Sequence, residues 1–125
     1  MYIIAQFPHS WKIGSTIYPH VHWKQTQSGS PVFKMDYKWF DMGASVPSTF
    51  TTYTMDTREV MYTSGSIMQL NYGTGISGSS IADISSMMLI KLYRDDNVYT
   101  GNAITYQFDI HIEQDMQGSR EEYSK

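Results

Sequence analysis

The sequence predicts an all-β fold, an antiparallel β-sandwich or jelly roll of about seven or eight strands. Three observations predict it. Apolar and polar residues alternate along most segments, helical periodicity is nearly absent, and Gly, Pro and Asn separate the alternating runs at regular spacing. Ten tyrosines, three tryptophans and many threonines also suit the half-buried surfaces of pleated sheets.

The length of 125 residues is enough for one domain with its own core. No internal repeat or linker divides the chain, so we expect a single β-sandwich domain over residues 1–116. Residues 117–125 are polar and are expected to be a tail or an assembly arm. Apolar residues make up 41% and charged residues 17%, a balance that excludes a disordered chain.

Charge and cysteine content exclude several classes of function. The net charge is −3 and no basic cluster is present, which argues against nucleic acid as a partner. Without cysteine, the chain has no disulfide, thiolate metal site or cysteine nucleophile. No apolar run approaches the roughly 20 residues that cross a bilayer. We therefore expect a soluble protein with no membrane partner.

The first two expected strands come before the first long polar loop. Residues 2–7 are apolar but lack the basic leader of a signal peptide, so we interpret them as a strand that Pro8 closes. Residues 16–23 alternate, with Val21 and Trp23 among the residues on one side and both histidines on the other. Pro19 removes one ladder N–H, which predicts an edge or bulged strand.

The middle of the chain carries the clearest alternation, over residues 32–40, after a polar loop at 25–31. There the apolar residues Phe33, Met35, Tyr37 and Trp39 alternate with Lys34, Asp36 and Lys38. This pattern predicts a strand with one buried face and one solvent-exposed face. Residues 49–55 and 58–70 are expected to add two further strands.

The last third begins with a Gly/Ser-rich segment, residues 71–80, which we expect to be a mobile loop. A short helix is considered for residues 81–86. Residues 85–93 are almost continuously apolar, as in a central strand covered on both faces. Residues 103–113 alternate, with an apolar side of Ile104, Tyr106, Phe108, Ile110 and Ile112 and a polar side of Thr105, Gln107, Asp109, His111 and Glu113.

The sharpest chemical feature is the pair His20 and His22, whose imidazoles point the same way in a strand. Their spacing from Gly14 resembles the first motif of the cupins, metal-binding jelly-roll proteins. Gln27 stands where that family has a glutamate ligand, and no second cupin motif follows. His111 is a third candidate ligand if the last strand lies beside this one.

Two other interpretations of these histidines remain open. Around a three-fold axis, an H-x-H strand supplies six nitrogen ligands, as in some phage fibre tips. Alternatively, His20 and His22 are ordinary hydrogen-bonded or solvent-facing strand residues. We adopt this last interpretation and assign no metal ligand, no cofactor and no catalytic residue.

The remaining polar groups give little support for catalysis. Asp109, Glu113, Asp95 and Asp96 are interpreted as solvating charges, although two carboxylates in one cleft would suit glycoside hydrolysis. No Gly-x-Ser-x-Gly elbow is present, and residues 73–75 lack the lysine and context of a phosphate loop.

The tryptophans divide into core and surface candidates. Trp23 and Trp39 fall on the apolar sides of their strands and are expected in the core. Trp11 follows Pro8 in a turn and is the best candidate for contact with a partner. It is also the anchor of an alternative function, a lectin-like module that stacks on a host-surface glycan.

Several stretches together resemble a family of tailed-bacteriophage structural proteins. They are Gln-Phe-Pro-His-Ser-Trp-Lys at 6–12 with Gly-Ser-Thr at 14–16, Tyr-Pro-His-Val-His-Trp at 18–23, Tyr-Lys-Trp at 37–39, Leu-Tyr-Arg-Asp at 92–95 and Gly-Ser-Arg-Glu-Glu at 118–122. The resemblance covers nearly the whole chain. It implies a β-rich, oligomeric subunit of the particle.

We therefore expect a non-enzymatic bacteriophage virion protein that acts in head, tail or fibre assembly. The expected partners are further copies of the chain, as a homotrimer, and other virion proteins. Two alternatives are kept: the lectin-like glycan-binding module, and a cupin-like metal-dependent enzyme that uses His20, His22 and His111.

Overall fold

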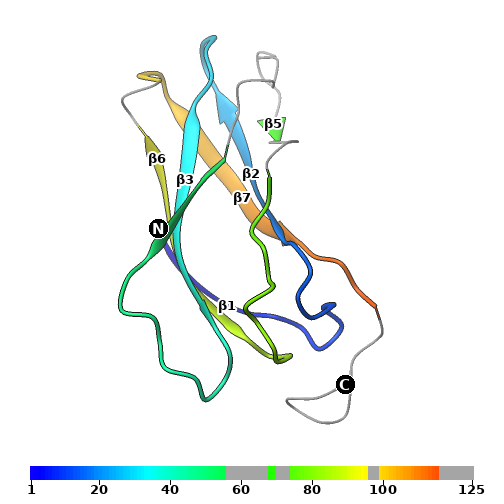
Figure 1. Cartoon of the computed structure of the whole chain (residues 1–125). Helices are drawn as coiled ribbons and strands as arrows, with labels where there is room; N and C mark the ends of the chain where they lie inside the picture. Colours follow the sequence, from blue (N-terminus) through cyan, green and yellow to red (C-terminus); the bar gives the residue numbers. More distant parts are fainter. Residues whose placement is uncertain (56–67, 70–73, 96–98, 116–125) are drawn as a thin grey trace.

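The structure is a computed structural model that describes residues 1–55, 68–69, 74–95 and 99–115. Within these ranges the chain forms antiparallel strands and no helix, which confirms the all-β prediction (Figure 1). No helix long and apolar enough to span a membrane therefore occurs in them. The strands are β1 (Tyr2–Gln6), β2 (Tyr18–Gln25), β3 (Val32–Phe40), β4 (Thr51–Met55), β5 (Met68–Gln69), β6 (Met87–Asp95) and β7 (Ala103–His111).

The described strands make two sheets. One has the order β1-β6-β3-β4, and the other has the order β5-β2-β7. The N-terminal strand thus pairs with β6, and β2 pairs with the C-terminal strand β7 (Figure 1). These long-range pairings bring residues from both ends of the sequence onto the same sheets.

One hydrophobic core joins the two sheets. Val21 and Trp23 of β2 lie in the same buried cluster as Met35 of β3 and Ile90 of β6. Phe108, Ile110 and Ile112 pack against that cluster from β7 and the residues just after it. Both sheets contribute to this core because every second side chain along each strand points towards it.

The expected faces of β3 are confirmed. Phe33 and Met35 are buried, and Tyr37 and Trp39 pack against the core. On the opposite face, the Asp36 carboxylate accepts hydrogen bonds from the hydroxyls of Thr52 and Tyr93.

Strand β6 is central, as expected, but only one of its faces is fully buried. Met88, Ile90 and Leu92 lie in the core. Met87 and Leu89 alternate with them and are half-buried on the outer face. The apolar outer face therefore lies outside the core that the two sheets share.

A β-bulge explains where the predicted faces of β7 fail. The register shifts between His22 and Trp23, which pair with Gln107 and Thr105, so Tyr106 is the extra residue. The shift reverses the alternation, and the side chains of Ile104 and Tyr106 are exposed instead of facing the core. The strand with Pro19 was expected at an edge or bulged, but the extra residue belongs to β7; among the described strands β2 lies between β5 and β7, and β5 pairs only with His22 and Trp23.

The segment before β6 was predicted to be a mobile loop followed by a short helix. Residues 81–86 form no helix; Ile84, Ser85 and Ser86 are buried in an irregular segment. Residues 74–80 lack regular structure, but the backbone of Ile76 exchanges two hydrogen bonds with Ile17. Most of the strand expected at 58–70 and the tail at 117–125 lie outside the described residues.

Trp11 is not a surface residue. Its side chain is 0% exposed, and its ring centroid lies 5.4 Å from that of Phe7 and 5.3 Å from that of Trp39. Trp11 also forms an isolated bridge with Gln114. The expectation of a partner contact was wrong because the chain after Pro8 folds back over the core, where a large apolar ring gains most from burial.

Candidate functional site

A cluster of polar side chains lies on the outer face of the β2–β7 pair. His20 and His22 alternate with buried Val21 and Trp23, so both imidazoles point away from the core. In the antiparallel register, His20 stands opposite Asp109. His111 lies two residues further along β7 and on the same face, because strand side chains repeat every two residues.

Three of these residues bring donor atoms together. His20 Nδ1 lies 3.2 Å from His111 Nε2, and His111 Nε2 lies 3.3 Å from Asp109 Oδ2. One donor atom from each residue falls within 4.8 Å of the others. We call His20, Asp109 and His111 the histidine–aspartate cluster. Its residue types, two imidazoles and a carboxylate, are common ligands of divalent transition metals.

His22 contacts the same carboxylate from the other side. Its Nε2 lies 3.4 Å from Asp109 Oδ1, yet Oδ1 is buried without a hydrogen-bond partner among the described residues. The contact is therefore an electrostatic one between poorly aligned groups. A buried carboxylate oxygen left without a hydrogen bond is costly, so this atom favours a nearby cation.

Burial and neighbouring charges both change the pKa of His20. Burial lowers the pKa of His20 below its ordinary value of 6.5, and the neighbouring His111 lowers it further, while Asp109 acts in the opposite direction. A neutral imidazole keeps a lone pair for a hydrogen bond or for a metal ion. Burial and His111 therefore favour the neutral form of His20, the form that binds a metal ion.

The last strand, β7, lies beside β2, so His111 is close to His20, as the third-ligand hypothesis required. Gln27 is not part of this cluster. Gln27 lies in the loop beyond β2, where its backbone oxygen accepts hydrogen bonds from the Gln25 side chain and the Tyr99 hydroxyl. The third donor of the cluster is Asp109 instead. Its interpretation as a solvating charge was wrong, because the cross-strand register that sets it opposite His20 is not visible in the sequence.

The other carboxylates take structural positions. Glu113 forms an exposed ion pair with Lys12, with 2.6 Å between Nζ and Oε1. Asp95 Oδ2 accepts a hydrogen bond of 2.8 Å from Lys34 at the end of β6. Asp96 and Gly73 lie outside the described residues.

A serine and a histidine also meet, at the turn before β6. Ser85 Oγ lies 2.6 Å from His9 Nε2, and Ser85 has a φ of 63°. A strained serine beside an imidazole is one feature of a nucleophile. Ser85 is, however, 0% exposed, so a substrate cannot reach it. The pair therefore fixes the turn that joins the N-terminal segment to β6.

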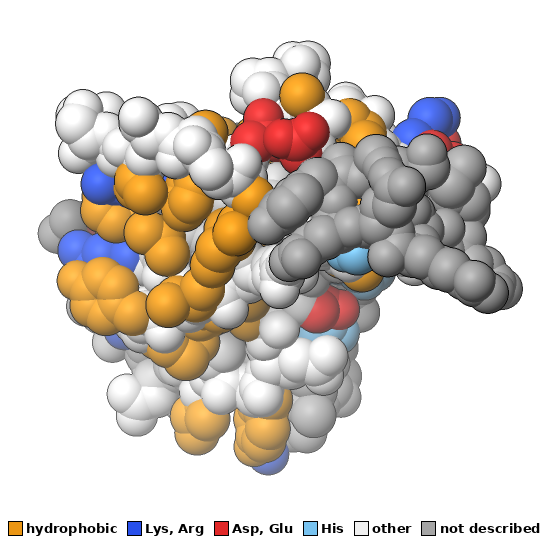
Figure 2. Space-filling model, turned by 90° about the horizontal axis from the view of Figure 1, so that it is seen from below, with side chains coloured by type: hydrophobic (Ala, Val, Ile, Leu, Met, Phe, Trp, Pro, Cys, Tyr) orange, Lys and Arg blue, Asp and Glu red, His pale blue; other side chains and the backbone are white. Residues whose placement is uncertain are grey.

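A second surface of interest is strand β1, an edge of its sheet. Tyr2 is 78% exposed and Ile4 is 70% exposed on its outer face. The register sets Ile4 beside half-buried Leu89, and Met87 beside Phe40. We call Tyr2, Ile4, Phe40, Met87 and Leu89 the outer apolar patch. Figure 2 shows hydrophobic side chains gathered on one part of the surface, with lysines among them.

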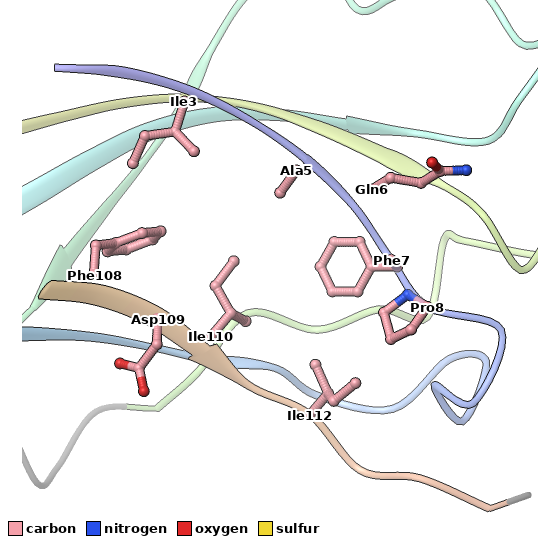
Figure 3. Close-up of a pocket in the computed structure, with 9 residues that line it drawn as sticks. All are labelled: Ile3, Ala5, Gln6, Phe7, Pro8, Phe108, Asp109, Ile110 and Ile112. Atoms are coloured by element: carbon pink, nitrogen blue, oxygen red, sulfur yellow. The ribbon is translucent and has the colours of Figure 1, made fainter. Parts of the chain in front are cut away.

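The inner face of β1 lines a groove. Its volume is about 360 Å³, and its apolar walls are Ile3, Ala5 and Phe7 on one side and Phe108, Ile110 and Ile112 on the other. Figure 3 shows these walls facing one another across the space between β1 and β7, while Asp109 points away. Strand β1 therefore has apolar side chains on both faces, and its outer edge is unpaired among the described strands.

No protein-family model, no curated protein and no solved structure matches this chain.

Proposed function

We propose that this chain is a non-enzymatic structural subunit that assembles with copies of itself along strand β1. The supporting observation is the composition of this edge. Residues Tyr2–Gln6 contain no charge and no proline, and Tyr2 and Ile4 are exposed. Such an edge offers unpaired backbone groups and apolar side chains to another strand.

An unprotected edge strand can pair with a strand of another chain. Soluble proteins protect them with charged residues, prolines, bulges or covering segments. The edge of β1 shows none of the first three in its five residues. An apolar edge that is covered in an oligomer needs no such protection, and the outer apolar patch beside it enlarges the area that a second copy would bury.

We assign the oligomer as a homotrimer and the domain as a β-sandwich in a tailed-phage particle. The shared core of the two sheets supports the sandwich. The trimer and the particle rest on the sequence resemblance. In a closed ring, β1 of each copy contacts a different surface of the next copy. Other virion proteins are the further partners.

Sedimentation velocity of the untagged chain and its Ile4→Lys variant tests the assembly. We expect the wild type to sediment as a trimer at tens of micromolar, and the variant as a folded monomer, because a buried lysine at the edge opposes pairing. Val46→Lys changes an exposed apolar residue in the loop after β3 and serves as the matched control. A wild type that stays monomeric, or variants that behave alike, would contradict the assignment.

The particle assignment has its own test. Mass spectrometry of purified phage particles should find the chain in stoichiometric amounts. Its presence in lysed cells but not in particles would remove the virion role and leave the self-association open to the sedimentation test.

The glycan-binding alternative depended on Trp11 as the residue that contacts the sugar. Trp11 lies in the core, so it cannot stack on a sugar at the surface.

A further inference from the structure

The histidine–aspartate cluster lies on the β2–β7 sheet, whereas the proposed assembly edge belongs to the other sheet. Paired strands hold all three residues: His20 is directly opposite Asp109, and His111 is opposite Tyr18. Paired strands are rigid supports for a binding site compared with loops. The side chains are therefore set in place before any ligand arrives.

The distances fit a metal ion. Metal–ligand bonds of about 2.0–2.1 Å in a tetrahedral site place neighbouring donor atoms about 3.3 Å apart. The two closest pairs in the cluster lie at 3.2 Å and 3.3 Å. The widest separation is no more than 4.8 Å, so a small closure completes the set.

The carboxylate gives a second, independent indication. Asp109 Oδ1 is buried and lacks a hydrogen bond among the described residues, while Oδ2 faces His111. A divalent ion at Oδ2 would neutralise the whole carboxylate, including the orphaned oxygen. His22, 3.4 Å from Oδ1, then acts as a positioning residue, since outer partners orient the groups that bind a metal.

The site is open on one side. The His111 side chain is 55% exposed, and a shallow cavity of about 340 Å³ lies next to it, lined by Thr16, Tyr18, His111, Ile112 and Glu113. Water can therefore fill the position that three protein ligands leave vacant, as in zinc sites with three protein ligands.

We propose that His20, Asp109 and His111 of one chain bind a single divalent transition-metal ion, with water completing the coordination. Two imidazoles and a carboxylate suit Zn²⁺, Co²⁺ and Ni²⁺ better than Ca²⁺ or Mg²⁺, which prefer all-oxygen sites. Zn²⁺ is the ion we assign. The site needs no second chain.

A simpler arrangement competes with this assignment. One neutral imidazole can donate to the other, and a His20–His111 hydrogen bond of 3.2 Å needs no ion. Such a pair leaves Asp109 Oδ1 without a hydrogen bond among the described residues, and only the His22 contact at 3.4 Å offsets its burial. The two arrangements differ in whether Asp109 contributes to metal affinity.

Calorimetric titration of the untagged, metal-free chain with Zn²⁺ tests the proposal, with Mg²⁺ as the comparison ion. We expect one Zn²⁺ per chain and no Mg²⁺ binding. Asp109→Asn and His111→Gln should each weaken Zn²⁺ binding by at least about 10–100-fold, the loss seen when even an outer partner of a metal site is removed. His22→Gln should weaken it less than His111→Gln.

Three results would overturn the site: no saturable Zn²⁺ binding, one Zn²⁺ per three chains, or His22→Gln abolishing binding while Asp109→Asn leaves it intact. The last two would shift the site to a shared axis or to the H-x-H pair. Circular dichroism checks that each variant folds. If one does not, amide shifts in the NMR spectrum of the wild type must locate Zn²⁺ at residues 20, 109 and 111, and shifts elsewhere would equally contradict the proposal.

Discussion

At the scale of single residues, the alternation of the sequence identified inward and outward side chains but not their neighbours. Val21 and Trp23 are buried and the two histidines face outward, as predicted. Asp109 was missed as a donor because its position opposite His20 depends on the cross-strand register. Trp11 was predicted at the surface because a tryptophan soon after a proline is expected in a turn. Its burial depends on the fold around it, which the local sequence does not show.

The burial of Trp11 leads to a prediction about stability. Trp11→Ala should lower the free energy of unfolding by about 3–5 kcal/mol, because it removes a fully buried ring and leaves a cavity beside Phe7 and Trp39. Urea denaturation followed by tyrosine fluorescence measures the change. Tyr106→Ala removes a side chain that is 57% exposed and should change stability by less than about 0.5 kcal/mol. Equal effects of the two substitutions would contradict the placement of Trp11.

The lowered pKa of His20 predicts a pH dependence in metal-free protein. Above the ordinary pKa of 6.5, the imidazole is neutral in both folded and unfolded chains. As the pH falls below that value, the unfolded chain takes up the proton first, so stability declines until the folded pKa is reached. Urea midpoints with EDTA, measured from pH 7.5 to 5, should fall less steeply for His20→Gln than for the wild type. Identical slopes would argue against a lowered pKa.

At the scale of elements, the faces of a strand were predicted correctly where the strand has no bulge. β3 was predicted well because it has no bulge, and its alternation continues over nine residues. β7 was predicted only in its second half, since the bulge at Tyr106 reverses the faces before it. A bulge is set by pairing with the partner strand, and the partner of β7 is separated from it by most of the chain. The short helix failed because tertiary burial of Ile84 and its neighbours outweighed local preference.

The loop that connects β2 to β3 depends on a buried amide. Gln25 Oε1 accepts a hydrogen bond from Trp23 Nε1, and its Nε2 donates to the backbone oxygens of Gln27 and Gly29. Gln25→Leu keeps the bulk but leaves these groups without partners, which should cost about 1–3 kcal/mol for each group that stays buried. Chemical denaturation measures the loss, and Gln107→Leu on the exposed part of β7 is the control. An unchanged stability would mean that water replaces the amide.

At the scale of the whole molecule, the two surfaces belong to different sheets. The outer apolar patch and the edge of β1 belong to the four-stranded sheet, and the histidine–aspartate cluster belongs to the three-stranded sheet. Metal binding and self-association should therefore be separable. Zn²⁺ affinity in the Ile4→Lys variant should match that of the wild type. An affinity that falls with dissociation of the oligomer would show that the site is completed by a second chain.

Hydrogen–deuterium exchange over a series of protein concentrations tests whether another copy covers β1. Peptides that contain residues 2–6 should become protected as concentration rises, because backbone groups at the edge acquire hydrogen-bond partners. Peptides from β3, whose backbone is already paired with β6 and β4, should exchange at a constant rate. If β1 exchanges at the same rate at every concentration, the edge is not an assembly surface and the proposed function fails.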